Sequence, residues 1–197
     1  MRIHTEIKRL RREDAVLAVI DIQERLMPAM GGGDAVTAAS AMLIRGCRTL
    51  GVPAIVTQQY TKGLGATVGP VALALTEGLA EGDGPADFAP VEKTAFSAMG
   101  VEEFRQRLAA AGRESVILCG VEAHVCVMQT ALDLLAAGFG VFVAADCVSS
   151  RRAFDAAAAL RRMAAAGAVE TSCESALFEM LGGAGQPGFK QISNLVK

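Results

Sequence analysis

The sequence predicts an α/β fold, in which helices cover both faces of a parallel β-sheet. Short apolar runs of strand length alternate with helical patterns along the 197 residues, as βαβ units require. The apolar runs lack regular polar alternation, which is expected of strands that are covered on both faces. Six strands are expected at residues 15–20, 54–57, 88–91, 116–118, 141–145 and 168–171.

Amphipathic or alanine-rich stretches between and after these runs predict the helices. They span residues 34–50, 101–111, 123–137, 152–166 and 173–181. The first helix is expected to begin with Asp34 as its N-cap, after the flexible bend Gly31-Gly32-Gly33. Glycines follow the first four helical patterns, where a left-handed residue commonly ends a helix. These glycines are Gly51, Gly112, Gly138 and Gly167.

Residues 60–90 form the least regular part of the chain and are rich in glycine and proline. Such a connection is longer than two neighbouring elements need, so a short helix near 70–80 and a functional or interface loop are expected. The sequence contains no internal repeat and no interdomain linker. A single domain over residues 1–197 is therefore expected.

Composition and charge argue against several classes of partner. The chain is 52% apolar with a formal net charge of −2, which gives no electrostatic reason to expect nucleic acid or an anionic membrane. Its apolar runs are far shorter than the roughly 20 residues of a membrane helix, and its N-terminus does not resemble a signal peptide. The expected location is the cytoplasm. No phosphate-binding glycine pattern follows any expected strand, and no cofactor is expected.

The five cysteines do not form a pattern typical of disulfides or zinc. Their number is odd and no pair has C-x-x-C spacing, so neither kind of site is expected. Each is expected to be reduced, small and buried unless its position argues otherwise. The five are Cys47, Cys119, Cys126, Cys147 and Cys173.

Asp21 and Cys126 stand where α/β proteins place functional residues. Asp21 directly follows the first apolar run, where partial desolvation would raise its pKa and make it a better base. An aspartate that caps the next turn is the alternative. Cys126 follows a glycine-containing turn near the start of a helix, where the helix dipole and unpaired N–H groups favour a thiolate and can hold an oxyanion. A buried, inert cysteine is the alternative there.

The partner of this cysteine is sought among nearby titratable residues. His124 is two residues away, and side chains at that spacing point about 200° apart on a helix, so a Cys–His dyad is not expected. His4 is the other histidine and lies near the N-terminus, so no histidine-based metal site is expected. Asp21 is therefore favoured as the base. Lys93, at the end of the third apolar run, could lower the thiol pKa and keep Asp21 ionised, although surface lysines are common.

Three segments together resemble the isochorismatase-like cysteine hydrolase family. The segments are Val19-Ile20-Asp21-Ile22-Gln23, Glu92-Lys93-Thr94-Ala95-Phe96-Ser97 and Gly120-Val121-Glu122-Ala123-His124-Val125-Cys126-Val127. The resemblance covers about residues 15–181, and the third segment is similar to hydrolases labelled isochorismatase-domain proteins. It implies a three-layer αβα sandwich with strand order 3-2-1-4-5-6, which brings the ends of the first and fourth strands to the topological switch point.

The resemblance also implies details of the site. It implies a cis peptide at Val121–Glu122 and an oxyanion hole made by the backbone N–H groups of Glu122 and Cys126. Because the third strand would lie about 10 Å from the first, Lys93 is expected to reach inward or to sit on a segment that folds over the site. Residues 57–63 lack the histidines that bind metal in the nicotinamidase branch, so neither that activity nor a metal is expected. True isochorismatases usually lack the cysteine, so the family name does not identify the substrate.

These observations predict a cysteine-dependent hydrolase of a small amide-type or other C–N substrate, with Asp21, Lys93 and Cys126 as its triad. Candidate pocket residues are Gln23, Gln59, Tyr60 and Phe96. Two other classes remain open: a redox-sensing thiol protein, and a non-catalytic oligomeric scaffold of the same fold. The apolar composition, the glycine-rich residues 60–90 and the resemblance favour a homo-oligomer.

Overall fold

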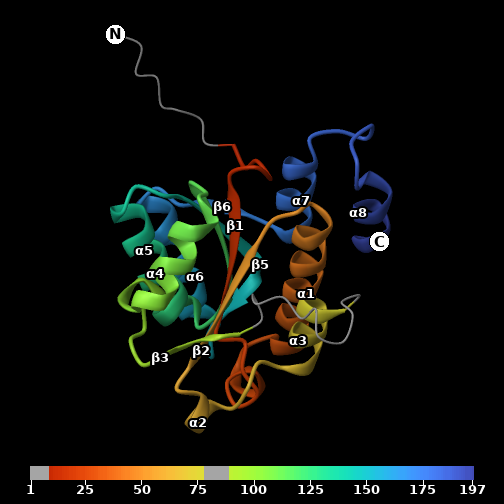
Figure 1. The fold of residues 1–197 in the computed structure, drawn as a ribbon. Coiled ribbons are helices and arrows are strands. Elements are labelled where there is room, and N and C mark those ends of the chain that lie inside the picture. Colours follow the sequence, from red (N-terminus) through yellow and green to blue (C-terminus); the bar gives the residue numbers. More distant parts are fainter. Residues whose placement is uncertain (1–8, 78–88) are drawn as a thin grey trace.

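The computed structural model describes residues 9–77 and 89–197 of the chain. A six-stranded parallel sheet of order β3-β2-β1-β4-β5-β6 runs through its centre and confirms the predicted order (Figure 1). The strands are β1 (Ala15–Ile20), β2 (Ala54–Gln59), β3 (Val91–Lys93), β4 (Ser115–Val121), β5 (Gly140–Ser149) and β6 (Val169–Thr171). Because β1 pairs with both β2 and β4, the carboxyl ends of β1 and β4 lie side by side at the switch point, where open α/β sheets bind ligands.

Helices cover both faces of the sheet and complete the predicted three layers (Figure 1). One face carries α1 (Gly33–Thr49), α3 (Gly69–Thr76), α7 (Cys173–Leu181) and α8 (Phe189–Leu195). The other face carries α4 (Glu102–Ala111), α5 (Met128–Ala136) and α6 (Ala153–Ala165). The connections contain the short helices η1 (Met27–Ala29), α2 (Thr61–Leu64) and η3 (Ala98–Gly100) and the π-helical turn η4 (Ala123–Val127).

The central strand β1 shows why the strands lack polar alternation. All six of its residues are buried. Leu17 and Val19 face the core under α1 and α7, whereas Val16, Ala18 and Ile20 face the core under α4 to α6. Two apolar cores therefore lie on opposite faces of the sheet, and this double burial is the dominant favourable contribution to folding.

Several boundaries differ from those expected. The edge strand β3 occupies Val91–Lys93 instead of residues 88–91, because it pairs with the last three residues of β2; Phe88 lies outside the described residues. β5 extends beyond residue 145, because its register with β4 shifts at a bulge and pairing resumes at Val148. The expected helix 123–137 is divided into η4 and α5.

The start of α1 also differs from the prediction. Its N-cap is Gly32, whose left-handed φ of 66° a glycine adopts without strain, and no side chain caps the helix. Asp34 lies in the first turn instead, where its charge still interacts favourably with the helix dipole. The helices α2 and α8 were not predicted, since both are short and α2 lies in the irregular region.

Gly120 makes the close approach of β4 to β1 possible. Its φ is +120°, and a Cβ atom at this position would lie 1.9 Å from the carbonyl oxygen of Ile20. No other residue type fits so close to a neighbouring backbone. Because Ile20 precedes Asp21, this glycine sets how closely the β4 turn approaches the Asp21 carboxylate.

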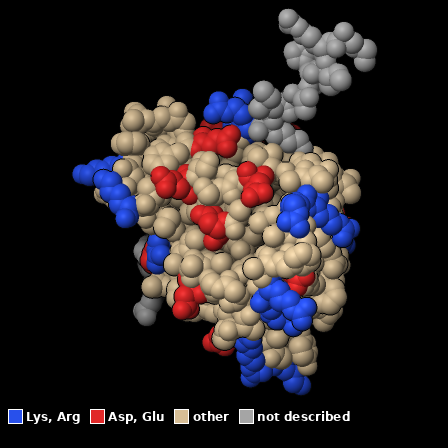
Figure 2. Space-filling view, turned by 180° about the vertical axis from the view of Figure 1, so that it is seen from behind, with Lys and Arg blue, Asp and Glu red and all other residues tan. Residues whose placement is uncertain are grey.

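Within residues 9–77 and 89–197, no helix is long and apolar enough to cross a bilayer. Figure 2 shows one face of the molecule, on which basic side chains lie mostly toward the edge and acidic ones nearer the centre. No continuous basic patch appears on the described part of that face, in keeping with the net charge of −2.

Candidate active site

Asp21 is a fully buried carboxylate at the carboxyl end of β1. Its φ of 51° is left-handed, a conformation that aspartate tolerates better than most residues, and it turns the chain away from the strand. Thr57 at the end of β2 donates a hydrogen bond of 2.7 Å to Oδ1. Lys93 Nζ lies 2.6 Å from Oδ2, and both side chains are 0% exposed. The carboxylate is thus held by one hydroxyl and one cation.

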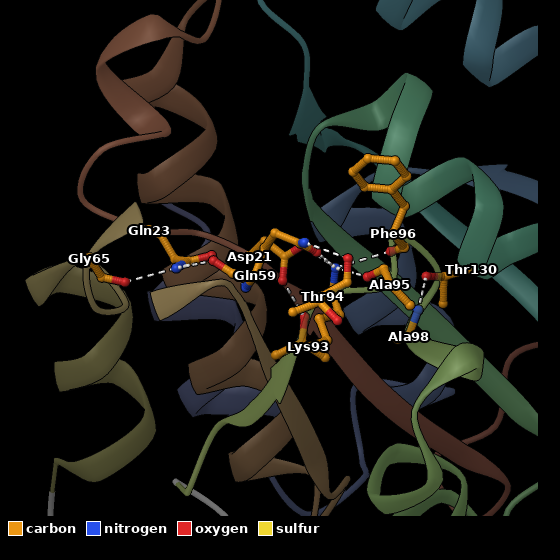
Figure 3. A network of polar contacts seen from close by, with 11 residues as sticks. Asp21, Gln23, Gln59, Gly65, Lys93, Thr94, Ala95, Phe96, Ala98 and Thr130 are labelled. Atoms are coloured by element: carbon orange, nitrogen blue, oxygen red, sulfur yellow. Dashed lines mark hydrogen bonds and ion pairs between the residues drawn. The ribbon is translucent and has the colours of Figure 1, made fainter. Parts of the chain in front are cut away.

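Lys93 reaches inward from the edge strand, as its distance from β1 requires. It is the last residue of β3, at the strand end where it was expected. Besides Asp21, its ammonium donates to Gln59 Oε1 at 2.7 Å and to the carbonyl oxygens of Phe96 at 3.0 Å and Ala95 at 3.3 Å (Figure 3). The surface-lysine alternative is therefore wrong, because this ammonium is fully enclosed by acceptors.

Cys126 lies in the π-helical turn η4, directly after β4. Cys126 is 6% exposed, and it lies near enough to Asp21 and Lys93 for both side chains to shift the pKa of its thiol. The turn begins after a cis peptide between Val121 and Glu122, the position that the resemblance implied. A carboxylate, an ammonium and a thiol from three different strand ends therefore meet at the switch point of the sheet.

The ionisation of the site differs from the expected thiolate. Burial raises the pKa of the Asp21 carboxyl, and the charge of Lys93 opposes this rise. Burial, followed by the negative charge of Asp21, raises the pKa of Cys126 to about 12, although Lys93 acts in the opposite direction. The expected lowering of the thiol pKa is wrong for this arrangement. The thiol is protonated at neutral pH, so its activation requires transfer of the proton to a base.

The candidate pocket residues fall into two groups. Gln23 is buried, and its amide group is used structurally: Nε2 donates to the carbonyls of Gln59 and Gly65, and Oε1 accepts from the Gln59 N–H. The Gln59 side chain accepts from Lys93 and donates to the carbonyl of Thr94 (Figure 3). These two glutamines therefore hold the lysine and the adjoining loops, and their amide groups are not free to bind a substrate.

Tyr60 and Phe96 are the aromatic candidates, and each is about half exposed. Tyr60 is 51% exposed and its N–H donates to the Lys93 carbonyl, whereas Phe96 is 53% exposed and its carbonyl accepts from the Lys93 ammonium. The Phe96 ring points away from the buried polar network (Figure 3). Both rings are attached to backbone that contacts Lys93, so they remain candidates for the rim of a pocket.

A second polar network fixes the turn that carries Cys126. Glu122 Oε2 accepts from the backbone N–H of Arg151 at 3.1 Å and from its Nε at 3.0 Å. His124 Nδ1 lies 2.9 Å from Ser150 Oγ. These contacts attach the turn that carries Cys126 to the loop after β5, and His124 contacts Ser150 in that loop. Sequence spacing alone gave no signal for these long-range pairs.

Thr130 connects helix α5, which follows Cys126, to the loop after Lys93, and it was not predicted. Its buried Oγ1 accepts a hydrogen bond of 2.9 Å from the N–H of Ala98 (Figure 3). It lies four residues after Cys126, one helical turn away. A threonine inside a helical pattern carries no distinctive signal, so only the tertiary structure identifies it as a residue that positions Lys93 relative to Cys126.

Replacing Thr130 tests this positioning role. Thr130→Val keeps the shape but leaves the buried N–H of Ala98 unpaired, so we expect a loss of about 1–3 kcal/mol in the free energy of unfolding. Thr130→Ser retains the hydroxyl acceptor and should preserve most of the wild-type stability. Urea unfolding of the two variants measures the difference. Equal stabilities of the valine and serine variants would show that the hydrogen bond contributes nothing.

A hollow in the surface lies elsewhere. It has a volume of about 760 Å³, and the triad residues do not line it. Residues from η1, the start of α1 and the start of α3 line it, among them Met27, Gly33, Val68 and Pro70. The candidate site is therefore the cluster of a carboxylate, an ammonium and a thiol at the ends of β1, β3 and β4, rather than this hollow.

The fold and the cluster define a class of protein: a doubly wound α/β protein with a carboxylate, an ammonium and a thiol at its switch point. Comparison with known proteins gives the family. The isochorismatase domain family model matches residues 15–175. The chain belongs to the isochorismatase-like family, with the hydrolase fold of that family.

Individual relatives agree with this assignment. Isochorismatase domain-containing protein 1 of Salmo salar is 42% identical over 177 residues, which cover 90% of this chain and 59% of that protein. The chain thus spans less than two thirds of the length of this relative. The secreted isochorismatase effector Isc1 of Phytophthora sojae is 39% identical, with 96% of this chain and 87% of that protein covered. The MAR1 ribonuclease structure from Caenorhabditis elegans superposes with a TM-score of 0.85 at 36% identity, covering 96% of this chain and 92% of that one.

Proposed function

We propose that this protein is a cysteine-dependent hydrolase that cleaves a small amide-type or other C–N substrate with Asp21, Lys93 and Cys126. The observation that carries the proposal is the meeting of a buried base, a buried cation and a thiol at one point of the sheet. Burying an ion pair costs free energy that a hydrophobic pair would not cost. Its presence beside a cysteine supports a chemical role rather than a role in stability alone.

The reaction begins with a proton transfer. Asp21 accepts the Cys126 proton, and the thiolate attacks the carbonyl carbon of the substrate. The backbone N–H groups of Glu122 and Cys126 hold the oxyanion. When the tetrahedral intermediate collapses, the C–N bond breaks and Asp21 gives its proton to the departing amine.

Hydrolysis of the thioester completes the cycle. Asp21 takes a proton from water as the water attacks the thioester carbonyl, and collapse releases the carboxylic acid and the thiolate. The proton on Asp21 then returns to Cys126. The raised pKa of Asp21 suits this work, because it makes the carboxylate a stronger base than that of an ordinary aspartate. Lys93 keeps the carboxylate ionised and oriented between these steps.

The two other classes receive less support. A redox-sensing cysteine is often placed next to a resolving cysteine, and no other cysteine lies within six residues of Cys126 in the sequence. A scaffold that had lost the reaction has no need of a buried Asp21–Lys93 pair beside its cysteine. The name ribonuclease belongs to the nematode relative, and the net charge of −2 gives this chain no general attraction for RNA.

The experiment is a hydrolysis screen of small amides, ureas and carbamates, with single-stranded RNA as a separate arm. We expect release of amine or ammonia from at least one small substrate by the wild-type protein and none above background by Cys126→Ala. Cys119→Ala serves as the control, because Cys119 is buried in the opposite core and outside the triad. RNA cleavage without amide hydrolysis, or full activity of Cys126→Ala, would contradict the proposal.

A homo-oligomer, a cytoplasmic location and a single domain over residues 1–197 stay predictions. The exposed side chains of Leu73 and Phe154 support the homo-oligomer, since large apolar groups at the surface often mark contacts between subunits. Light scattering of the purified chain measures the mass of the particle, and a monomer would overturn this prediction.

A further inference from the structure

Ser97 carries a buried hydroxyl without a hydrogen-bond partner. Within residues 9–77 and 89–197, two buried side-chain oxygens have no such partner, Asp21 Oδ2 and Ser97 Oγ. Asp21 Oδ2 lies 2.6 Å from Lys93 Nζ, so its charge is compensated. Ser97 is 8% exposed, and its hydroxyl has no hydrogen-bond partner in the described part of the chain. A hydroxyl that loses its hydrogen bonds to water and gains none costs stability, so its presence needs a reason.

The backbone places Ser97 between Lys93 and the nucleophile helix. The carbonyl of Phe96, one residue earlier, accepts a hydrogen bond of 3.0 Å from Lys93 Nζ. The N–H of Ala98, one residue later, donates a bond of 2.9 Å to Thr130 on the helix that follows Cys126 (Figure 3). The segment that carries Ser97 therefore joins the Lys93 ammonium, beside Asp21, to the helix that follows Cys126.

We propose that Ser97 is a specificity residue whose hydroxyl binds a neutral carbonyl or amide group of the substrate. This inference rests on the proposed hydrolase function. The charged groups that act on Cys126 are Asp21 and Lys93, and their opposite charges compensate each other. A serine hydroxyl both donates and accepts a hydrogen bond without adding charge. The site is thus built for an uncharged amide or urea rather than for a substrate with a carboxylate beside the reacting carbonyl.

Two alkylating agents of similar size test this preference. Iodoacetamide carries a neutral amide and iodoacetate a carboxylate, and mass spectrometry gives the rate at which each modifies Cys126 at pH 9. We expect the ratio of the iodoacetamide rate to the iodoacetate rate to be higher for Cys126 than for free cysteine. Ser97→Ala should lower the ratio about 3–10-fold, the effect of one hydrogen bond between neutral groups. Ser97→Thr, which keeps the hydroxyl, should retain the wild-type ratio.

A stability measurement separates this role from a structural one. Ser97→Ala removes an unpaired hydroxyl, so its resistance to urea should equal or exceed that of the wild type. Ser40→Ala is the matched control: Ser40 is also buried, but it donates to the Cys147 carbonyl, and its loss should lower stability without changing the ratio.

Either of two results would overturn the assignment: an unchanged ratio in Ser97→Ala, or a loss of stability or folding in that variant. These outcomes differ from failure of the proposed function. That failure would appear as hydrolysis that does not depend on Cys126, whatever the alkylation ratio.

Discussion

Asp21→Asn is expected to lower kcat/KM by about 10²–10⁴-fold, because it removes the proposed proton acceptor while keeping the shape of the side chain. The same change should make the thiol of Cys126 more acidic. In the wild type, burial and the Asp21 charge together raise the pKa of Cys126 to about 12. Asparagine removes the negative charge but leaves Lys93 in place, so the thiolate gains a nearby cation without an opposing anion.

The two expected effects have opposite signs. Hydrolysis should fall, whereas alkylation of Cys126 by iodoacetamide between pH 8 and 10 should become faster than in the wild type. Rates of both reactions across that pH range give the measurement. Asp34→Asn is the control, because Asp34 is an exposed carboxylate in the first turn of α1 and should change neither rate.

This pairing distinguishes a base from a residue that only supports the fold. A damaged site would lose hydrolysis and would change all thiol reactivities without a consistent sign. If Asp21→Asn lost hydrolysis and Cys126 also became harder to deprotonate, Asp21 would not control the proton of the thiol. If hydrolysis persisted near the wild-type level, Asp21 would be removed from the mechanism.

Strand content and strand order followed from the sequence because they depend on local patterns. Apolar runs such as residues 15–20 mark strands that are buried on both faces, and the resemblance then implied their order. The positions of Asp21 and Cys126 at strand ends were equally visible. To predict these positions, one needs only the chain direction and the rule that the carboxyl ends of parallel strands lie at one edge of the sheet.

The features that were not predicted depend on tertiary contacts. The third strand was expected at residues 88–91, but its pairing with β2 places it at Val91–Lys93. Gln23 appeared to be a pocket residue, but its amide group joins the ends of two loops. The pKa of Cys126 moved opposite to expectation, because dipole and cation arguments omitted how deeply the thiol is buried. Burial of a titratable group by distant segments cannot be inferred from its immediate neighbours in sequence.

Lys93→Met is expected to reduce stability by about 3–5 kcal/mol near neutral pH, because it leaves the Asp21 carboxylate buried without its cation. It should also abolish most hydrolysis. The cost should depend on pH. Burial raises the pKa of Asp21 and the charge of Lys93 lowers it. Without this lysine, the pKa of Asp21 in the folded state therefore rises further above 3.8. Between 3.8 and that raised value the folded state binds more protons than the unfolded state, and stability falls as the pH increases.

Urea unfolding at pH 5 and pH 8 measures this dependence, with Lys62→Met, an exposed lysine in α2, as the control. The penalty for Lys93→Met should be larger at pH 8 than at pH 5. The double variant Asp21→Asn/Lys93→Met should recover much of the lost stability without recovering activity, because no buried charge remains. A penalty that is equal at both pH values, or a double variant no more stable than Lys93→Met, would show that the ion pair does not determine the stability of this site. Recovery of stability without activity is the result expected if the buried pair serves the reaction of Cys126 rather than the fold.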